Sequence, residues 1–314
     1  MLEAILSVSF IHALLVATVR MSTPLLFTAL GEMYSERAGL VNIGLDGIMT
    51  IGALFGFLGT YITGNPLFGV LLGTLSGILI NMIYAFSTVT IRANQIVNGM
   101  ALNILCPALA TFIYRSYFGI KTSLDKVPLL GNIKIPLLGD IPFIGSIFFN
   151  QNILVYFSFI LVIISYIFFN KTKAGLNYKS VGEYPKAAES LGINVIAKKY
   201  IACILCGGLA GLGGAYLTTC YIKSFSDGLV AGRGFIALSA VIFGRWKPSG
   251  IFLATLIFGF ADALQLRLQV LDNSIPYQIL AMLPYAITLF SLIFFGSKNA
   301  GPKANGKPYY REAK

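Results

Sequence analysis

The sequence predicts an all-α, polytopic integral membrane protein with about nine transmembrane helices, in a range of roughly eight to ten. Of its 314 residues, 56% are apolar and only 11% are charged, whereas about a quarter are charged in an average soluble protein. The 23 Lys and Arg and 12 Asp and Glu are too few for a soluble surface, and the apolar content excludes a disordered chain. The 33 Gly fit a membrane bundle, because small residues let membrane helices approach closely.

The apolar segments give the order of the spans, since a transmembrane helix needs about 20 apolar residues. The first segment, 4–31, is apolar except at Arg20. Residues 47–91 carry no charge and provide two helices, which divide at the Asn-Pro turn within 61–66. The Gly-rich run 207–214 predicts close helix packing. Further spans are expected at 93–114, 153–169, 200–222, 234–244, 249–261 and 274–297.

The net charge of +11 is concentrated in two hydrophilic segments. Residues 171–199 carry six Lys, and residues 298–314 carry four Lys and one Arg. Clustered Lys and Arg beside membrane spans mark the cytoplasmic side, so this charge does not indicate nucleic acid. We expect one transmembrane domain over 1–297, with an external loop at 116–151, a cytoplasmic loop at 171–199 and a basic cytoplasmic tail at 298–314. Alternation of the spans then places the N-terminus outside.

Motifs for catalysis, metal binding and nucleotide binding are missing from the sequence. The segment most like a phosphate-binding loop, 244–247, lacks the second Gly and the hydroxyl residue after the Lys. His12 is the only histidine, and the four Cys lie in or beside apolar spans as small apolar residues. We expect neither an enzyme nor a cofactor or metal site. A solute moved uphill must then draw on a partner or an ion gradient, and gradient-driven carriers usually keep several intramembrane carboxylates. Only Glu32, Asp46 and Asp262 are candidates here.

The cytoplasmic loop contains a segment that predicts a short docking helix. Pro185 can open a helix and Gly192 can close it, and the residues between them, Lys-Ala-Ala-Glu-Ser-Leu, favour helix. A short, capped helix with small side chains suits docking into a groove of another protein. The alternative is an ordinary connection, but 29 residues are more than neighbouring helices need.

Three stretches of the chain together resemble one family of membrane proteins. They are Ser-Glu-Arg-Ala-Gly-Leu-Val-Asn-Ile-Gly-Leu-Asp-Gly at 35–47, Val-Gly-Glu-Tyr-Pro-Lys-Ala-Ala-Glu-Ser-Leu-Gly-Ile-Asn at 181–194, and Gly-Arg-Gly-Phe-Ile-Ala-Leu-Ser-Ala-Val-Ile-Phe-Gly-Arg-Trp at 232–246. The chain as a whole is similar to transmembrane permease subunits of ABC importers of the ribose, branched-chain amino acid and nucleoside class, closest to the purine-nucleoside (guanosine-type) branch. The resemblance implies a permease in the cell membrane of a prokaryote, forming the path for a nucleoside and driven by a partner ATPase.

The resemblance also implies the partners and the coupling residues. The partners are a cytoplasmic ABC ATPase, a paralogous second permease that forms a heterodimer with this chain, an extracellular solute-binding lipoprotein, the lipid bilayer and a small polar solute, without nucleic acid. The family's coupling helix has Glu where this chain has Lys186, so Glu183 or Glu189 would supply the acidic contact. The residues carried over are Glu183, Lys186, Ala187, Ala188, Glu189 and Gly192.

Two other functions stay open at this point, a simple-sugar (ribose-like) ABC permease and a gradient-driven secondary transporter. The docking-type loop and the few intramembrane carboxylates favour an ABC permease over the secondary transporter. Support for a nucleoside from the residues themselves comes from the amide-rich start of 93–114 and from aromatic rings that could stack on a base.

Two segments, 39–47 and 232–240, are expected to be breaks in helices that line the solute path. Each contains Gly and adjoins an apolar run, and a broken helix exposes backbone groups that a water-filled path can satisfy and lipid cannot. The two segments also belong to a candidate internal repeat, because 38–45 and 231–238 share four identities at an offset of 193 residues.

Polar and aromatic residues near these breaks are the candidates for contact with solute. Asn42 and Asp46, four residues apart, would share one face if the segment is helical. In the alternative interpretation this segment is a cytoplasmic cap, in which Glu36 and Arg37 are solvated. The candidate path residues are Asn42, Asp46, Asn98, Asn103 and Phe235.

Overall fold

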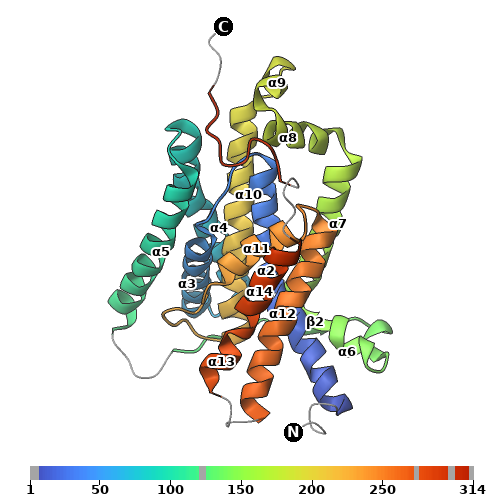
Figure 1. Cartoon of the computed structure of the whole chain (residues 1–314). Coiled ribbons are helices and arrows are strands. Elements are labelled where there is room, and N and C mark those ends of the chain that lie inside the picture. The colour runs from blue at the N-terminus through green and yellow to red at the C-terminus, as the bar shows by residue number, and fades with distance from the viewer. Residues whose placement is uncertain (1–6, 120–124, 272–275, 296–300, 311–314) are drawn as a thin grey trace.

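Long helices run side by side and make up most of the structure (Figure 1). The computed structural model describes residues 7–119, 125–271, 276–295 and 301–310. Within these residues, seven helices are long and apolar enough to cross a membrane, and two shorter apolar helical segments accompany them. The predicted multi-pass helical fold is therefore confirmed. The long helices are α2 (Val8–Arg37), α3 (Leu45–Thr63), α4 (Pro66–Ala85), α5 (Gln95–Phe118), α7 (Ile153–Lys171), α10 (Val195–Tyr216) and α12 (Pro248–Leu271).

The other elements are short. Helices α4 and α10 each continue into a π turn, at Phe86–Thr90 and Leu217–Ile222. Strands β1 and β2 form an antiparallel pair, with a 3-10 turn and α6 between them. The short elements are β1 (Asn132–Lys134), the 3-10 turn (Leu138–Asp140), α6 (Ile144–Phe148), β2 (Asn150–Asn152), α8 (Lys173–Glu183), α9 (Pro185–Ser190), α11 (Arg233–Phe243), α13 (Tyr277–Ala281) and α14 (Leu283–Phe295).

Helix α2 is continuous across Arg20, where the apolar run of the sequence is interrupted. The Ser7 side chain caps its start by accepting a hydrogen bond from Phe10 N at 3.3 Å. The Arg20 guanidinium donates to Gln151 Oε1 at 3.0 Å. Because this charge has a polar partner inside the protein, it does not force a break in the helix.

Helices α3, α4 and α10 pack with their backbones in contact at Gly residues. A Cβ atom on Gly52 would lie 2.3 Å from the carbonyl oxygen of Gly211, and one on Gly211 would lie 2.4 Å from that of Gly73. The close packing predicted for the run 207–214 is confirmed. Such contacts need small residues, because membrane helices associate largely through van der Waals packing.

We expect Gly211→Ala to lower the free energy of unfolding by about 1–3 kcal/mol, the usual effect of overpacking a well-packed core. The added methyl group would meet the backbone of α4, which cannot move aside alone. Gly208→Ala is the matched control in the same helix, because the nearest atoms to its Cβ would be side-chain atoms, Ile78 Cγ1 at 3.3 Å and Thr74 Cγ2 at 3.7 Å. Thermal unfolding of both variants in detergent measures the difference, and equal midpoints would contradict the prediction.

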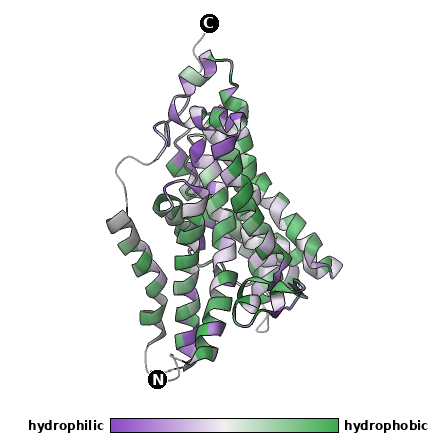
Figure 2. Ribbon diagram, turned by 90° about the vertical axis from the view of Figure 1, so that its right-hand side faces the viewer, coloured by the Kyte–Doolittle hydropathy of each residue, from purple (hydrophilic) through white to green (hydrophobic). Residues whose placement is uncertain are grey.

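The bundle has two distinct ends. The connection between α5 and α7 lies at one end, where Val127 N donates to Lys223 O at 2.8 Å. Helices α8 and α9 and residues 301–310 lie at the other end, where the Arg92 guanidinium sits 4.9 Å from the centre of the Tyr310 ring. Hydrophilic residues gather toward this second end (Figure 2). Segments expected on the same side of the membrane thus lie at the same end of the bundle.

The first predicted break, 39–47, overlaps an irregular segment, whereas the second, 232–240, is wrong, because 233–240 is helical in α11 and the irregular residues precede it. Helix α3 begins at Leu45 and α11 at Arg233, so the irregular segments are 38–44 and 223–232. The span expected at 249–261 is also longer and forms part of the 24-residue α12. The helix continues past the apolar run because Asp262, the carboxylate that ends this run, is buried and paired with Arg233 instead of facing lipid.

Candidate functional site

The irregular segment 38–44 leaves α2 and turns back into the bundle, where other helices satisfy its backbone. Gly39 has a φ of +80°, in the left-handed region that favours Gly. The Gln95 side-chain oxygen accepts from Val41 N at 2.8 Å, and the Tyr84 hydroxyl donates to Val41 O at 2.5 Å. Lipid offers no such partners, so a break persists only where protein or a water-filled cavity supplies them.

Asn103 of α5 provides the same support at the start of α3. Its side-chain nitrogen donates to Ile43 O at 2.7 Å, and its side-chain oxygen accepts from Gly47 N at 2.8 Å. The Asn103 amide therefore satisfies two backbone groups that lack helical partners at the break, the carbonyl of Ile43 and the N–H of Gly47. In this structure the Asn103 amide is engaged by the backbone of the broken segment.

Asn42 lies in a buried polar cluster and is 0% exposed. Its backbone N–H donates to Glu32 Oε1 at 2.8 Å, and its side chain donates to Asn81 Oδ1 at 2.7 Å. Its side-chain oxygen accepts from Gly44 N at 2.9 Å. Asn42 thus holds the segment in shape from inside. The helical face expected to be shared by Asn42 and Asp46 is not formed, because α3 begins after Asn42.

Asp46 joins the two breaks to each other. Its Oδ1 accepts from Gly234 N at 2.9 Å, and this carboxylate caps α11, whose first N–H groups have no partner within the helix. Gly232, before the start of α11, has a φ of +77°. A Cβ atom on Gly234 would lie 2.3 Å from Asp46 N, so the starts of α3 and α11 are in direct contact.

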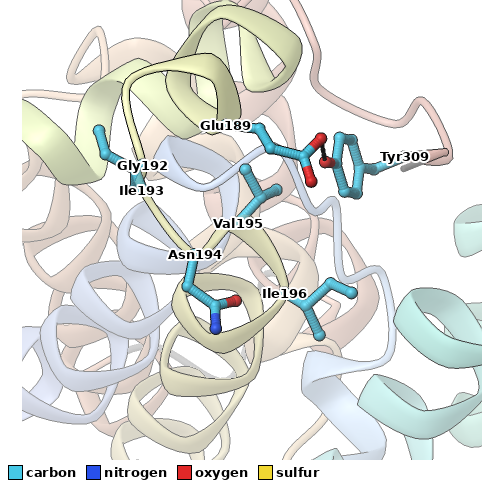
Figure 3. Close-up of a pocket in the computed structure, with 7 residues that line it drawn as sticks. All are labelled: Glu189, Gly192, Ile193, Asn194, Val195, Ile196 and Tyr309. Carbon is cyan, nitrogen blue, oxygen red and sulfur yellow. Dashed lines mark hydrogen bonds between the residues drawn. The ribbon is translucent and has the colours of Figure 1, made fainter. Parts of the chain in front are cut away.

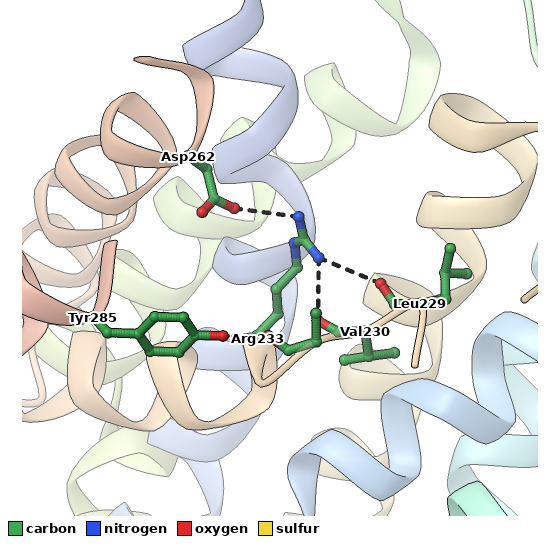
Figure 4. A network of polar contacts seen from close by, with 6 residues as sticks. Leu229, Val230, Arg233, Asp262 and Tyr285 are labelled. Atoms are coloured by element: carbon green, nitrogen blue, oxygen red, sulfur yellow. Dashed lines mark hydrogen bonds and ion pairs between the residues drawn. The ribbon is translucent and has the colours of Figure 1, made fainter. Parts of the chain in front are cut away.

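Arg233, the first residue of α11, is anchored by an ion pair and two carbonyl groups (Figure 4). Its guanidinium lies 3.4 Å from Asp262 Oδ2 of α12 and donates to Val230 O at 3.1 Å and to Leu229 O at 3.3 Å. Asp262 is 7% exposed, and an intramembrane carboxylate is costly unless it is paired. The ion pair therefore fixes the start of α11 against α12.

The remaining candidate path residues differ in their surroundings. Asn98 accepts from Ser87 Oγ at 2.8 Å and donates to Asn94 O at 3.0 Å, at the connection between α4 and α5. Phe235 follows Gly234 on α11 and is 47% exposed. The structure brings Asn42, Asp46 and Asn103 together around the first break and places Phe235 beside it. Asn98 belongs to a separate contact.

Several residues that support the break were not identified from the sequence. Asn81 carried a usable signal, because it and Asn65 are the only amide side chains in 47–91 and Asn65 lies at the turn. Tyr84 carried none, since a Tyr in an apolar helix is common. Lys199 is 2% exposed, with its Nζ 3.5 Å from Gly39 O; the cationic stretch in which it lies suggested a solvated side chain.

The short helix expected between Pro185 and Gly192 is present as α9. Pro185 is its first residue, and Gly192 follows it with a φ of +81°. Ala187 is exposed, whereas Ala188 is 1% exposed and packs with Val181 and with the start of α10. Ala187 is thus the small residue that α9 presents outward, and Ala188 fastens α9 to its own protein.

Helix α8 touches the end of α2 next to the first break. A Cβ atom on Gly182 would lie 2.3 Å from Arg37 O and 3.2 Å from Gly39 N. Burial raises the pKa of Tyr178 well above its usual value, and its hydroxyl donates to Tyr34 O at 2.8 Å. The segment that carries α9 is therefore packed directly on the segment that begins the break.

The alternative interpretation of 39–47 as a cytoplasmic cap with a solvated Glu36 is wrong for Glu36. This residue is 3% exposed, and its Oε2 accepts from Trp246 Nε1 at 2.6 Å and from Asn305 Nδ2 at 2.7 Å. Arg37 donates to Trp246 O at 2.9 Å through Nη2. The end of α2 is thus bound to the turn between α11 and α12.

Known proteins resemble this chain over nearly its whole length. It is 39% identical to NupQ, the guanosine ABC transporter permease protein of Bacillus subtilis (strain 168), over 97% of this chain and 98% of NupQ. It is 40% identical to NupC, the nucleoside ABC transporter permease protein of Lactococcus lactis subsp. cremoris (strain MG1363), over 92% of this chain and 94% of NupC. It is 33% identical to TsgC13 of Haloferax volcanii, which is named for glucose ABC transport, over 91% of this chain and 92% of TsgC13.

The family match covers both breaks and the α8–α9 segment. The family described as the permease component of branched-chain amino acid transport systems matches residues 14–292. Its members are membrane components of transporters and not enzymes, in line with the absence of catalytic motifs from the sequence. The chain belongs to this family of ABC transporter permeases.

Proposed function

We propose that this permease forms the translocation path for a nucleoside in an ABC importer of a prokaryotic cell membrane. The observation that carries the proposal is the identity of 39% and 40% to two permeases named for guanosine and nucleoside transport, over nearly the full length of all three chains. The partners we propose are a cytoplasmic ATPase, a paralogous second permease and an extracellular solute-binding lipoprotein. Residues 1–297 would form the permease domain.

The proposed orientation puts the end with α8 and α9 in the cytoplasm. Residues 171–199, the described tail residues 301–310 and the turn 245–247 carry cations and lie at that end, as expected of cytoplasmic loops. Only residues 301–310 of the tail are described. The loop 116–151 would then lie outside, where a lipoprotein carrying the solute can dock.

A cysteine at Gly131 tests this orientation, because the position is exposed and a Cβ atom there would meet nothing within 4 Å. We expect it to react with a membrane-impermeant maleimide on intact cells. A cysteine at Lys173, exposed at the opposite end, should react only after lysis. The reverse pattern would invert the proposed topology.

The breaks offer a neutral polar solute both polar groups and an aromatic surface. Asn42 and Asn103 are engaged in holding the first break, so direct contact falls to residues at the junction that remain accessible. Asp46 is half-buried and Phe235 is 47% exposed. A carboxylate can accept hydrogen bonds from a sugar or a base, and a ring can stack on a base.

ATPase movement would reach the path through the α8–α9 segment. Helix α9 would dock on the ATPase through Ala187, with Glu183, Lys186, Glu189 and Gly192 around it. Helix α8 contacts the first break at Gly182 and Gly39. Helix α3, which follows that break, contacts α11, which follows the second break, through Asp46. This continuous series of contacts supports coupling between the ATPase and the path.

Uptake by the complete complex in vesicles tests the substrate class. We expect labelled guanosine or cytidine to be taken up with ATP, and labelled ribose and glucose to be excluded. The second candidate is a simple sugar, favoured by the 33% identity to TsgC13. Uptake of ribose or glucose without nucleoside uptake would select it, and uptake without ATP in the presence of an ion gradient would reject both.

A further inference from the structure

Residues 301–310 form a strap beside α8 and α9, with turns at 303–306 and no helix or strand (Figure 1). Ala304 N donates to Gly182 O at 2.9 Å, and Lys303 N donates to Glu183 Oε2 at 3.4 Å. The Tyr309 hydroxyl donates to Glu189 of α9 (Figure 3). Backbone and side chains of the strap are thus bound to the end of α8 and to α9.

The same strap is fixed to the ends of the long helices. Its Asn305 donates to the buried Glu36 carboxylate at 2.7 Å. A Cβ atom on Gly301 would lie 3.1 Å from the Trp246 ring, and one on Gly39 would lie 3.3 Å from Ala304 O. The strap therefore covers the place where α8 meets the first break. It is held at Glu36 by Asn305 and at α9 by Tyr309.

A groove of about 650 Å³ separates the strap from α9. Its lining includes Tyr184 and Ala187 from the α9 side and Pro308 and Tyr310 from the strap. Three cations, Lys186, Lys303 and Lys307, line the same groove and are exposed, against one carboxylate, Glu183, which is bonded to the strap. The lining is therefore partly apolar and carries more positive than negative charge.

We propose that residues 301–310 form the second wall of the ATPase-docking groove, and that the ATPase fills it with a surface that is partly apolar and partly acidic. The inference rests on the proposed docking of α9, since the groove is continuous with that helix and shares Ala187. Attraction between Lys186, Lys303 and Lys307 of the groove and acidic residues of the ATPase would then orient the ATPase. Helix α9, which lines the groove, lies beyond the ends of the long helices (Figure 1), which favours a protein partner over the membrane surface.

Charge reversal at the strap tests the proposal without disturbing the fold. Lys307 and Lys303 are both exposed, so Lys307→Glu, alone and with Lys303→Glu, should leave the complex in the membrane. Lys303 Nζ also bonds the Tyr184 hydroxyl at 2.5 Å, so the single variant Lys307→Glu separates the effect of charge from the loss of that bond. We expect the double variant to weaken binding of the purified ATPase to the permease pair in nanodiscs by about tenfold at low salt, and less at 0.5 M salt, where the Debye length falls to roughly 4 Å. Lys173→Glu is the matched control at the same end of the bundle, and we expect a change below about twofold.

Each outcome separates this inference from the proposed function. Normal ATPase binding by the double variant, together with loss of binding by Ala187→Trp, would overturn the role of the strap and leave docking by α9 intact. Normal binding by both would overturn both. A binding loss that appears only in anionic nanodiscs and disappears in neutral ones would identify the membrane as the partner of the lysines and would also overturn the inference.

Discussion

Ala187→Trp is expected to abolish ATP-driven transport while the permease stays folded in the membrane. Ala187 is exposed on α9, so the larger side chain meets solvent in the isolated permease and should change its stability by no more than about 0.5 kcal/mol. At an interface packed as densely as a protein interior, the same side chain would hold the ATPase away from the groove. Vesicle uptake and co-purification with the ATPase measure the two consequences.

The matched control is Ala174→Trp, the same substitution at an exposed position on α8. It should retain transport and ATPase binding. Ala188→Trp is less informative, because Ala188 is buried against Val181 and Val195 and a Trp there would displace α9 itself. If Ala187→Trp transports at the parental rate, α9 is not the docking element.

Asp46→Leu is expected to reduce transport by at least about tenfold, with ATPase binding unchanged. The substitution removes the cap of α11, an interaction type worth about 0.5–2 kcal/mol, at the point where the starts of α3 and α11 meet. A factor of ten corresponds to about 1.4 kcal/mol. Leu also leaves Gly234 N without its carboxylate partner in a setting that offers little water. Initial uptake rates at saturating ATP measure the effect.

Two further variants test whether transport depends on the hydrogen bond that caps α11. Asp46→Asn keeps a side-chain oxygen that can accept from Gly234 N, and we expect it to retain transport within about threefold of the parent. Asn42→Leu should instead lower thermal stability, because it leaves Asn81 Oδ1 and Gly44 N without the buried partner that each has in Asn42. Parental transport by Asp46→Leu would show that the two breaks need no connection at this point.

Composition and local pattern were sufficient for the membrane fold and for much of its order. Apolar length decides that a segment spans, and the turn at Asn65 is encoded by the local Asn-Pro signal. The same holds for α9, whose boundaries depend on Pro185 and Gly192 within one short segment. These features depend on neighbours in the chain, so they can be read from it directly.

The roles of the polar residues were decided by the tertiary structure. Asn42 and Asn103 are amides near a break in the sequence, but their partners show that they hold the break. The contact that joins the breaks lies between residues 188 positions apart, Asp46 and Gly234, and the one that fixes the strap joins residues 269 positions apart, Glu36 and Asn305. A carboxylate or amide in a membrane must find a partner, so the sequence by itself determined that such partners exist. Only the fold decided which distant group each one binds, because that choice depends on which helices pack together.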